Sequence, residues 1–181
     1  MNSAIDLDRF KLAHEKGGVE HGSTYATAIS ELRAGQKRSH WIWYVFPQAI
    51  EGKSLNARTY QIRSLAEAEA YVADDLLWGR YVESVVAVEQ SLWRNVSDEG
   101  RAWRLEPVLG SDVDARKFRS SLTLFFKVTQ RDTSDRTAVF REMVDYVGRE
   151  MPIIWGGRMS CSSTLVLYER WKSRPDQSKE S

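Results

Sequence analysis

Apolar residues at helical spacing are the feature of this chain that most restricts its fold. Between residues 74 and 92 they recur every three or four positions, which places them on one face of an α-helix: Leu77, Tyr81, Val85, Val88 and Leu92. Asp74 and Asp75 stand where such a helix would begin, and aspartate is a favoured N-cap residue. The segment therefore predicts an amphipathic helix with one buried face.

Comparable signals mark further helices. A stripe that starts at Tyr25 follows the potential caps Ser23 and Thr24, and capping patterns open the segments "SLAE" at 64–67 and "SDVD" at 111–114. We therefore predict an all-α fold, a single compact domain of about six or seven short helices. These helices cover approximately residues 7–16, 24–34, 64–73, 75–92, 111–126, 134–147 and 160–171.

The stretches between these helices are predicted as loops. "GGVEHGST" at residues 17–24 has the composition of a flexible loop. Residues 49–63 form a loop with room for a turn of helix. Residues 97–106 are polar, and Pro107 prevents a continuous helix through it because proline lacks the N–H that a helix interior needs.

The segment "HWIWYVF" at residues 40–46 is ambiguous. Its aromatic and β-branched residues are typical of a strand, and Pro47 ends the run. Periodicity alone cannot distinguish so short an apolar run from a buried helix. We expect an extended aromatic segment that forms a buried wall with a polar edge, because large aromatic side chains contribute much buried area.

The composition is that of a globular domain. A chain of 181 residues can bury about 70% of the surface that its unfolded form exposes. Its 26 basic and 25 acidic residues are nearly balanced, which argues against nucleic acid as a partner. We expect residues 1–172 to form one globular helical domain and residues 173–181 to form a flexible polar tail.

Cysteine usage and the N-terminal segment indicate the compartment. Cys161 is the one cysteine, so no intramolecular disulfide can form, as is usual in a reducing cytosol. The first residues carry charges every few positions, unlike a signal peptide, and no apolar run approaches the length of a transmembrane helix. The sequence therefore predicts a soluble cytoplasmic protein without a membrane partner.

Three blocks of sequence carry a family resemblance. "ELRAGQKRSHWIWYVFPQ", "SLAEAEAYVAD" and "VLGSDVDARKFRSSLTLF" resemble, in this order, the signature blocks of the bacterial domain-of-unknown-function family 1810. The resemblance covers approximately residues 7–171 and implies a helical, single-domain fold, but it implies no activity. Some members carry the label calpastatin, although inhibitors of that type are disordered and this composition is that of a packed globule.

The chain departs from the family pattern in two places. The loop "HEKGGVEHGS" is longer than usual, and the family's Gly-x-x-Asp near the C-terminus is replaced by Gly157–Ser160. A serine at that place can still cap a helix but brings no carboxylate.

Two polar clusters beside apolar runs form the candidate ligand site. "KRSH" at 37–40 and "RKFRSS" at 116–121 would together supply donors suited to an oxyanion such as phosphate or carboxylate. Tryptophans in the first segment could stack against a ring of the ligand. The glutamine after Pro47 could form hydrogen bonds with the edge of the ligand or with buried backbone groups. The candidate ligand-binding residues are Arg38, Ser39, Trp41, Trp43, Gln48, Lys117, Arg119, Ser120 and Ser121. In the structural alternative, the cations are solvated or paired with acids and the tryptophans belong to the core.

His40 is the candidate catalytic residue, because imidazole exchanges protons near neutral pH. No carboxylate stands at a telling local spacing, and the nearest acid downstream is Glu51, so a structural role is the alternative. The three histidines form no metal-ligand pattern, and glycine-rich phosphate loops are absent. We expect no metal and no cofactor.

These observations leave three hypotheses of function. The first is a binding protein for a small anionic, ring-containing ligand held between residues 38–48 and 117–123. The second is a hydrolase acting on a nucleotide-like substrate, with His40 as general base. The third is a protein-interaction module with an exposed patch of Trp93, Trp103 and Trp171.

Overall fold

The computed structural model describes residues 5–50, 52–97, 104–132, 134–150 and 161–173. Within these ranges the chain forms ten helices and no strand, which confirms the all-α class. Seven helices match the predicted ones, and the short helices α3, α4 and α7 raise the number above the predicted six or seven. Helix α7 contains Pro107, through which no helix was expected, because the proline lies in its first turn, where an N–H group needs no partner within the helix. The helices are α1 (Asp8–Lys16), α2 (Tyr25–Arg33), α3 (Ile42–Val45), α4 (Leu55–Thr59), α5 (Leu65–Ala73), α6 (Asp75–Ser97), α7 (Leu105–Leu109), α8 (Asp112–Thr129), α9 (Asp135–Glu150) and α10 (Ser162–Lys172).

The predicted N-caps form the bonds expected of them. Four side-chain oxygens each accept a hydrogen bond of 3.1–3.3 Å from the backbone N–H three residues further on: those of Thr24, Ser64, Asp74 and Ser111. Each bond satisfies an N–H group that has no partner within its helix. The starts of α2, α5, α6 and α8 are therefore encoded locally.

The expected extended form of the aromatic segment is wrong, because residues 42–45 form the one-turn helix α3. The turn forms hydrogen bonds within its own backbone: Val45 N–H donates to the Trp41 carbonyl and Phe46 N–H to the Ile42 carbonyl. Most of the segment is buried, and no described strand lies beside it. A helical turn bonds its own backbone groups, whereas a buried strand would need a neighbouring strand to do so.

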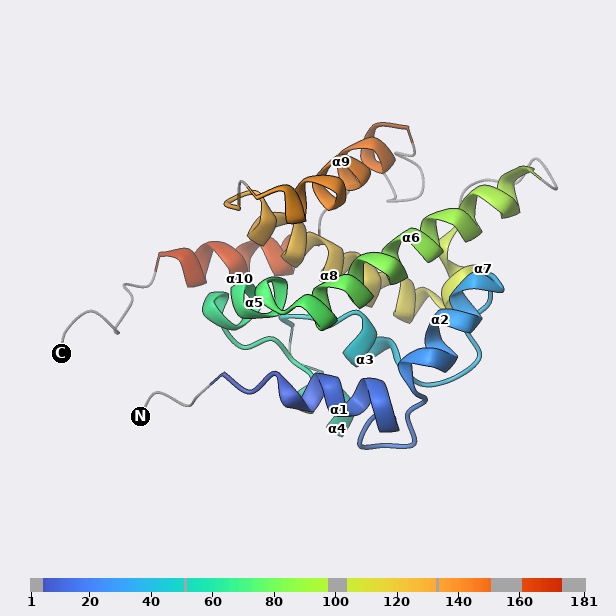
Figure 1. Ribbon diagram of the computed structural model, residues 1–181, viewed down its shortest axis with the longest axis horizontal. Helices are drawn as coiled ribbons and strands as arrows, with labels where there is room; N and C mark the ends of the chain where they lie inside the picture. The colour runs from blue at the N-terminus through green and yellow to red at the C-terminus, as the bar shows by residue number, and fades with distance from the viewer. Residues whose placement is uncertain (1–4, 51, 98–103, 133, 151–160, 174–181) are drawn as a thin grey trace.

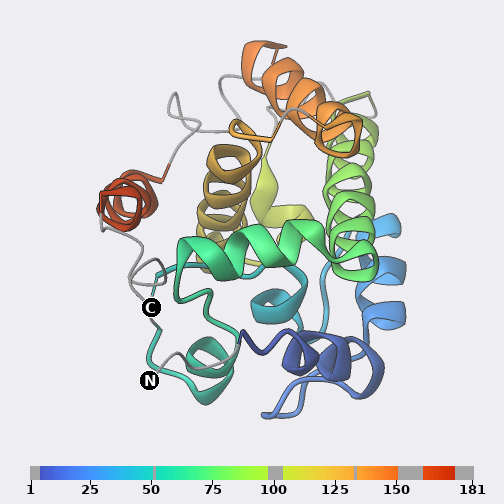
Figure 2. The same ribbon diagram turned by 60° about the vertical axis from the view of Figure 1, so that its left-hand side comes forward.

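Helix α8 occupies the centre of the fold. It packs against α3, α5, α7, α9 and α10, and Figures 1 and 2 show α9 on one side of it and α5 and α3 on the other. The ring of Phe118 on α8 lies 4.7 Å from that of Phe46, and the ring of Phe125 lies 4.6 Å from that of Tyr81 on α6. The buried apolar residues form one hydrophobic cluster around these contacts.

The loop predicted at residues 17–24 is anchored to the core. Asn56 on α4 donates to the Glu20 carbonyl at 3.2 Å, and its Oδ1 accepts from the Glu20 N–H at 3.3 Å. The Tyr44 hydroxyl donates to the Ser23 carbonyl at 2.5 Å. These contacts fix the loop against α3 and α4.

Two glycines lead to opposite predictions. A Cβ at Gly22 would overlap the backbone of Gly18 and the Tyr44 hydroxyl, whereas a Cβ at Gly79, inside α6, meets nothing within 4 Å. We expect Gly22→Ala to lower the free energy of unfolding by about 2 kcal/mol or more. Gly79→Ala should raise it by about 0.5–1 kcal/mol, because alanine is the better helix former. Urea unfolding of both variants checks this, and a stable Gly22→Ala protein would contradict the tight packing of the loop.

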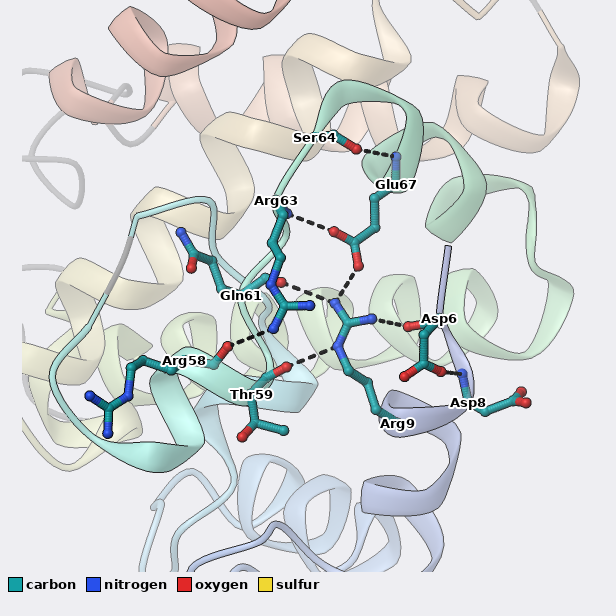
Figure 3. A network of polar contacts seen from close by, with 9 residues as sticks. All are labelled: Asp6, Asp8, Arg9, Arg58, Thr59, Gln61, Arg63, Ser64 and Glu67. Atoms are coloured by element: carbon teal, nitrogen blue, oxygen red, sulfur yellow. Dashed lines mark hydrogen bonds and ion pairs between the residues drawn. The ribbon is translucent and has the colours of Figure 1, made fainter. Parts of the chain in front are cut away.

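A buried ion pair ties α1 to α5. Figure 3 shows the guanidinium of Arg9 directed at the Glu67 carboxylate and at backbone carbonyls of Thr59 and Gln61. The side chains of Arg9 and Glu67 are only 10% and 7% exposed. Glu67 also accepts from the Arg63 N–H at 2.6 Å. Because both carboxylate oxygens of Glu67, and Nε and Nη2 of Arg9, are bonded within the protein, this pair has a structural role.

Candidate functional site

Glu31 on α2 organises the segment that leads into α3. Its Oε2 accepts hydrogen bonds from the Arg38 N–H at 2.8 Å, the Ser39 N–H at 3.1 Å and the Trp41 indole at 2.8 Å. Burial by itself would raise the pKa of the Glu31 carboxyl, but these hydrogen bonds outweigh it and the pKa is lowered. The ionised carboxylate of Glu31 therefore holds residues 38–41 in place.

A second carboxylate joins the two predicted clusters. Asp114 on α8 accepts from Lys37 at 2.8 Å and from Lys117 at 2.9 Å. Burial would raise the pKa of Asp114, but its hydrogen bonds to the two ammonium groups lower it overall. The segments around residues 37–48 and 114–117 therefore meet in space, with one positive charge left over among these three side chains.

A cavity of about 90 Å³ opens where the segments meet, and we call it the Trp43 cavity. The Lys117 ammonium lies 4.5 Å from the centroid of the Trp43 ring, in a cation–π contact at its wall. Gln48, also in the wall, donates to the Phe46 carbonyl at 3.3 Å. The residues that line the cavity are Trp43, Gln48, Ile50, Gly52, Ala57, Tyr60 and Lys117.

The other predicted site residues between positions 38 and 41 do not line this cavity. Arg38 is exposed, and its guanidinium donates to the side chain of Gln36 at 3.0 Å. Trp41 is completely buried and serves the core, with its indole N–H bound to Glu31. Ser39 contributes its backbone N–H to the same carboxylate.

The predicted residues of α8 point in different directions. Residues two positions apart on a helix lie about 200° apart around its axis, so Lys117 and Arg119 face nearly opposite sides. Ser120 is bonded to Thr164 on α10 at 2.8 Å, and Ser121 to Tyr81 on α6 at 3.3 Å. The two serines connect helices, and Arg119 does not line the Trp43 cavity.

His40 lies at the surface beside the cavity. Its imidazole stacks on the Trp43 ring, with ring centroids 6.4 Å apart and an angle of 28° between the planes. Its backbone carbonyl accepts from the Ser23 N–H at 3.0 Å. Among the described residues, no carboxylate is bonded to the imidazole, so the orienting partner of a general base is not found there.

The predicted set lacks several contributors to this region, among them Glu31, Asp114 and Tyr60. Asp114 was recognised only as part of a helix start, and helical spacing could have placed it on the same face as Lys117. Glu31 lies seven to ten residues before its partners, and Tyr60 lies in a segment without a regular pattern. Local sequence carries no signal for either contact.

The remaining sequence hypotheses are only partly covered by the described residues. Trp93 is 41% exposed, Trp171 packs partly against the core, and Trp103 lies outside the described residues. Gly157–Ser160 and all of the predicted tail except Ser173 also lie outside them. In the part of the chain that the structure describes, no three His, Cys, Asp or Glu side chains gather as a metal site would require. No described helix is both long and apolar enough to cross a membrane.

Comparison with known proteins gives a family and one related structure. The family model described as "Protein of unknown function (DUF1810)" matches residues 4–150. The crystal structure of a conserved hypothetical protein from Mycobacterium tuberculosis has 32% sequence identity to this chain and a TM-score of 0.67. The match covers 92% of this chain and 99% of that one. No curated protein matches the chain.

Proposed function

We propose, from the premise that this chain belongs to the DUF1810 family, that it binds a small anionic ligand in the Trp43 cavity. The ligand carries a phosphate or a carboxylate, and Lys117 is its principal partner. The observation that carries this proposal is the position of the Lys117 ammonium in the wall of a cavity built from two distant segments of the chain.

The charges around the cavity favour an anion. Lys37 and Lys117 share the single carboxylate of Asp114, so neither ammonium has a carboxylate to itself. Lys117 is partly buried, and a charge removed from bulk water interacts more strongly with a nearby ion. An anionic group in the cavity would complete the coordination of this lysine while Lys37 keeps Asp114 ionised.

The size of the cavity limits what enters it. Pockets for complete small molecules usually measure about 300–1,000 Å³, whereas this cavity measures about 90 Å³. It suits the anionic group of a ligand, with the rest of the molecule outside. A ring attached to that group would lie against the exposed His40 imidazole, which continues the aromatic surface of Trp43.

Binding is tested by thermal shift with inorganic phosphate, sugar phosphates, nucleotides, ADP-ribose and simple dicarboxylates as probes. We expect at least one probe to raise the melting temperature of the parent protein by mass action. Lys117→Ala should weaken its binding about tenfold or more, because a hydrogen bond to a charged group contributes about 1.5–3 kcal/mol.

Arg116→Ala is the matched control, since Arg116 is the adjacent cation on α8 but pairs with Asp112 at the surface and does not line the cavity. Arg119→Ala serves as a second control from the far side of the helix. A probe that binds equally well to the parent and to Lys117→Ala would count against this site. If no probe binds the parent, the proposed function fails.

The hydrolase hypothesis has weaker support than binding. A general base usually needs a group that orients it, and the described residues place only the Trp43 ring against the His40 imidazole. We therefore assign His40 to the ligand surface. His40→Ala is expected to weaken only ring-bearing probes, without affecting inorganic phosphate.

A further inference from the structure

Three buried polar atoms between α1, α5 and α6 have no hydrogen-bond partner within the described protein. They are Nδ1 of His14, the hydroxyl of Tyr71 and Nη1 of Arg80. His14 is 3% exposed and Tyr71 is completely buried. A buried polar group without a hydrogen-bond partner destabilises the folded state, and buried polar groups in native proteins are nearly always paired.

Aromatic contacts connect the three side chains to one another through Tyr25 and α1. The His14 ring lies 5.1 Å from the ring of Tyr25, and the Arg80 guanidinium lies 4.8 Å from the centroid of the same ring. Tyr71 contacts Phe10, with ring centroids 5.3 Å apart, and Phe10 lies one helical turn before His14 on α1. Tyr25 therefore contacts both His14 and Arg80, and Tyr71 contacts the helix that carries His14.

The electrostatics agree with this arrangement. Burial lowers the pKa of His14 and raises that of Tyr71, and in both cases the nearby charge of Arg80 acts to lower the pKa. Two carboxylates that could pair with Arg80 already form other ion pairs: Asp74 pairs with Lys11, and Glu83 pairs with Arg33. No ion pair among the described residues involves Arg80.

The hydrogen-bonding requirements of the site identify its occupant. The His14 Nε2 lies 2.9 Å from the Tyr44 carbonyl, which can only accept, so Nε2 carries the proton and Nδ1 is an acceptor. Arg80 can only donate, and the tyrosine hydroxyl can do both. The occupant must therefore donate to His14 and accept from Arg80, which an oxyanion without protons cannot do.

We propose that His14, Tyr71 and Arg80 bind one internal water molecule that links α1, α5 and α6. Water meets both requirements, and buried waters in proteins typically form about three hydrogen bonds to groups of this kind. The site is separate from the Trp43 cavity, because none of its residues lines that cavity.

Tyr71→Phe tests this proposal by removing one hydroxyl without changing the shape of the side chain. If the hydroxyl is bonded to the water, its removal should lower the melting temperature by about 2–4 °C. If the hydroxyl is unsatisfied, its removal should leave the melting temperature unchanged or raise it, and the proposal would be overturned. A crystal structure of the parent protein should show one solvent peak within hydrogen-bond distance of all three atoms.

Tyr81→Phe is the matched control. Tyr81 is equally buried in the same core, and its hydroxyl has a protein partner in Ser121 at 3.3 Å. We expect the two variants to lose similar stability. A crystal structure without this solvent peak, or a peak that responds to added chloride or phosphate, would also overturn the assignment to water.

Discussion

Replacing Glu67 by glutamine is expected to lower the free energy of unfolding by about 3 kcal/mol. Breaking a buried ion pair by removing one charge usually costs about 3–5 kcal/mol, because the other charge stays buried without compensation. Here Arg9 would keep its bonds to the carbonyls of Thr59 and Gln61, so we expect a loss of stability at the lower end of this range. Urea unfolding at neutral pH, followed by circular dichroism, measures the difference.

Glu69→Gln is the control for this prediction, because it makes the same change two residues further along α5. Glu69 pairs with Arg131 at 3.7 Å, and the two side chains are 51% and 53% exposed. Exposed pairs contribute about 0–1 kcal/mol, so we expect a change of about 0.5 kcal/mol or less. Equal losses of stability in the two variants would show that burial of the Arg9–Glu67 pair is not what stabilises the contact between α1 and α5.

Because of His14, the free energy of unfolding is expected to fall by about 3 kcal/mol between neutral pH and pH 4. Burial lowers the pKa of its imidazole from 6.5 to about 4 in the folded protein. Between these values the unfolded chain binds a proton that the folded protein does not. Stability therefore falls as the pH falls through this window, and the contribution is complete only above about pH 6.5.

The measurement compares the free energy of unfolding at pH 7 and at pH 4.5, where most carboxyl groups of the unfolded chain are still ionised. We expect the loss over this interval to be about 2–3 kcal/mol smaller in His14→Phe than in the parent. The phenylalanine preserves the ring contact with Tyr25 but cannot take up a proton. His40→Ala removes an exposed imidazole and should keep the pH dependence of the parent. A His14→Phe variant with an unchanged pH dependence would refute the prediction.

The helical class and most helix boundaries could be predicted because their causes are local. Ser64 and Ser111 cap their helices through backbone groups three residues away, and the stripe from Leu77 to Leu92 is buried as its spacing requires. The aromatic segment at 40–46 was the exception. Its strand-like composition reflects a preference for half-buried sheets, and this preference was outweighed because α3 is buried with no described strand to pair with.

The candidate site was predictable only in part. Trp43, Gln48 and Lys117 were singled out from their types and neighbours, and they do line one cavity. Lys117 and Arg119 were grouped because they are close in sequence, although the period of a helix separates their directions. Trp41 was taken as a surface for stacking a ring and the two serines of α8 as ligand donors, whereas the structure gives them partners within the protein.

The sequence by itself determined where the long helices begin and which of their faces are apolar, because caps and stripes act over three or four residues. Only the tertiary structure decided that Lys117 meets Trp43, that Glu31 holds residues 38–41, and that Arg9 reaches Glu67. These contacts join residues up to 74 positions apart in the sequence. Such pairings depend on how whole helices pack around α8, and no short stretch of the chain encodes that arrangement.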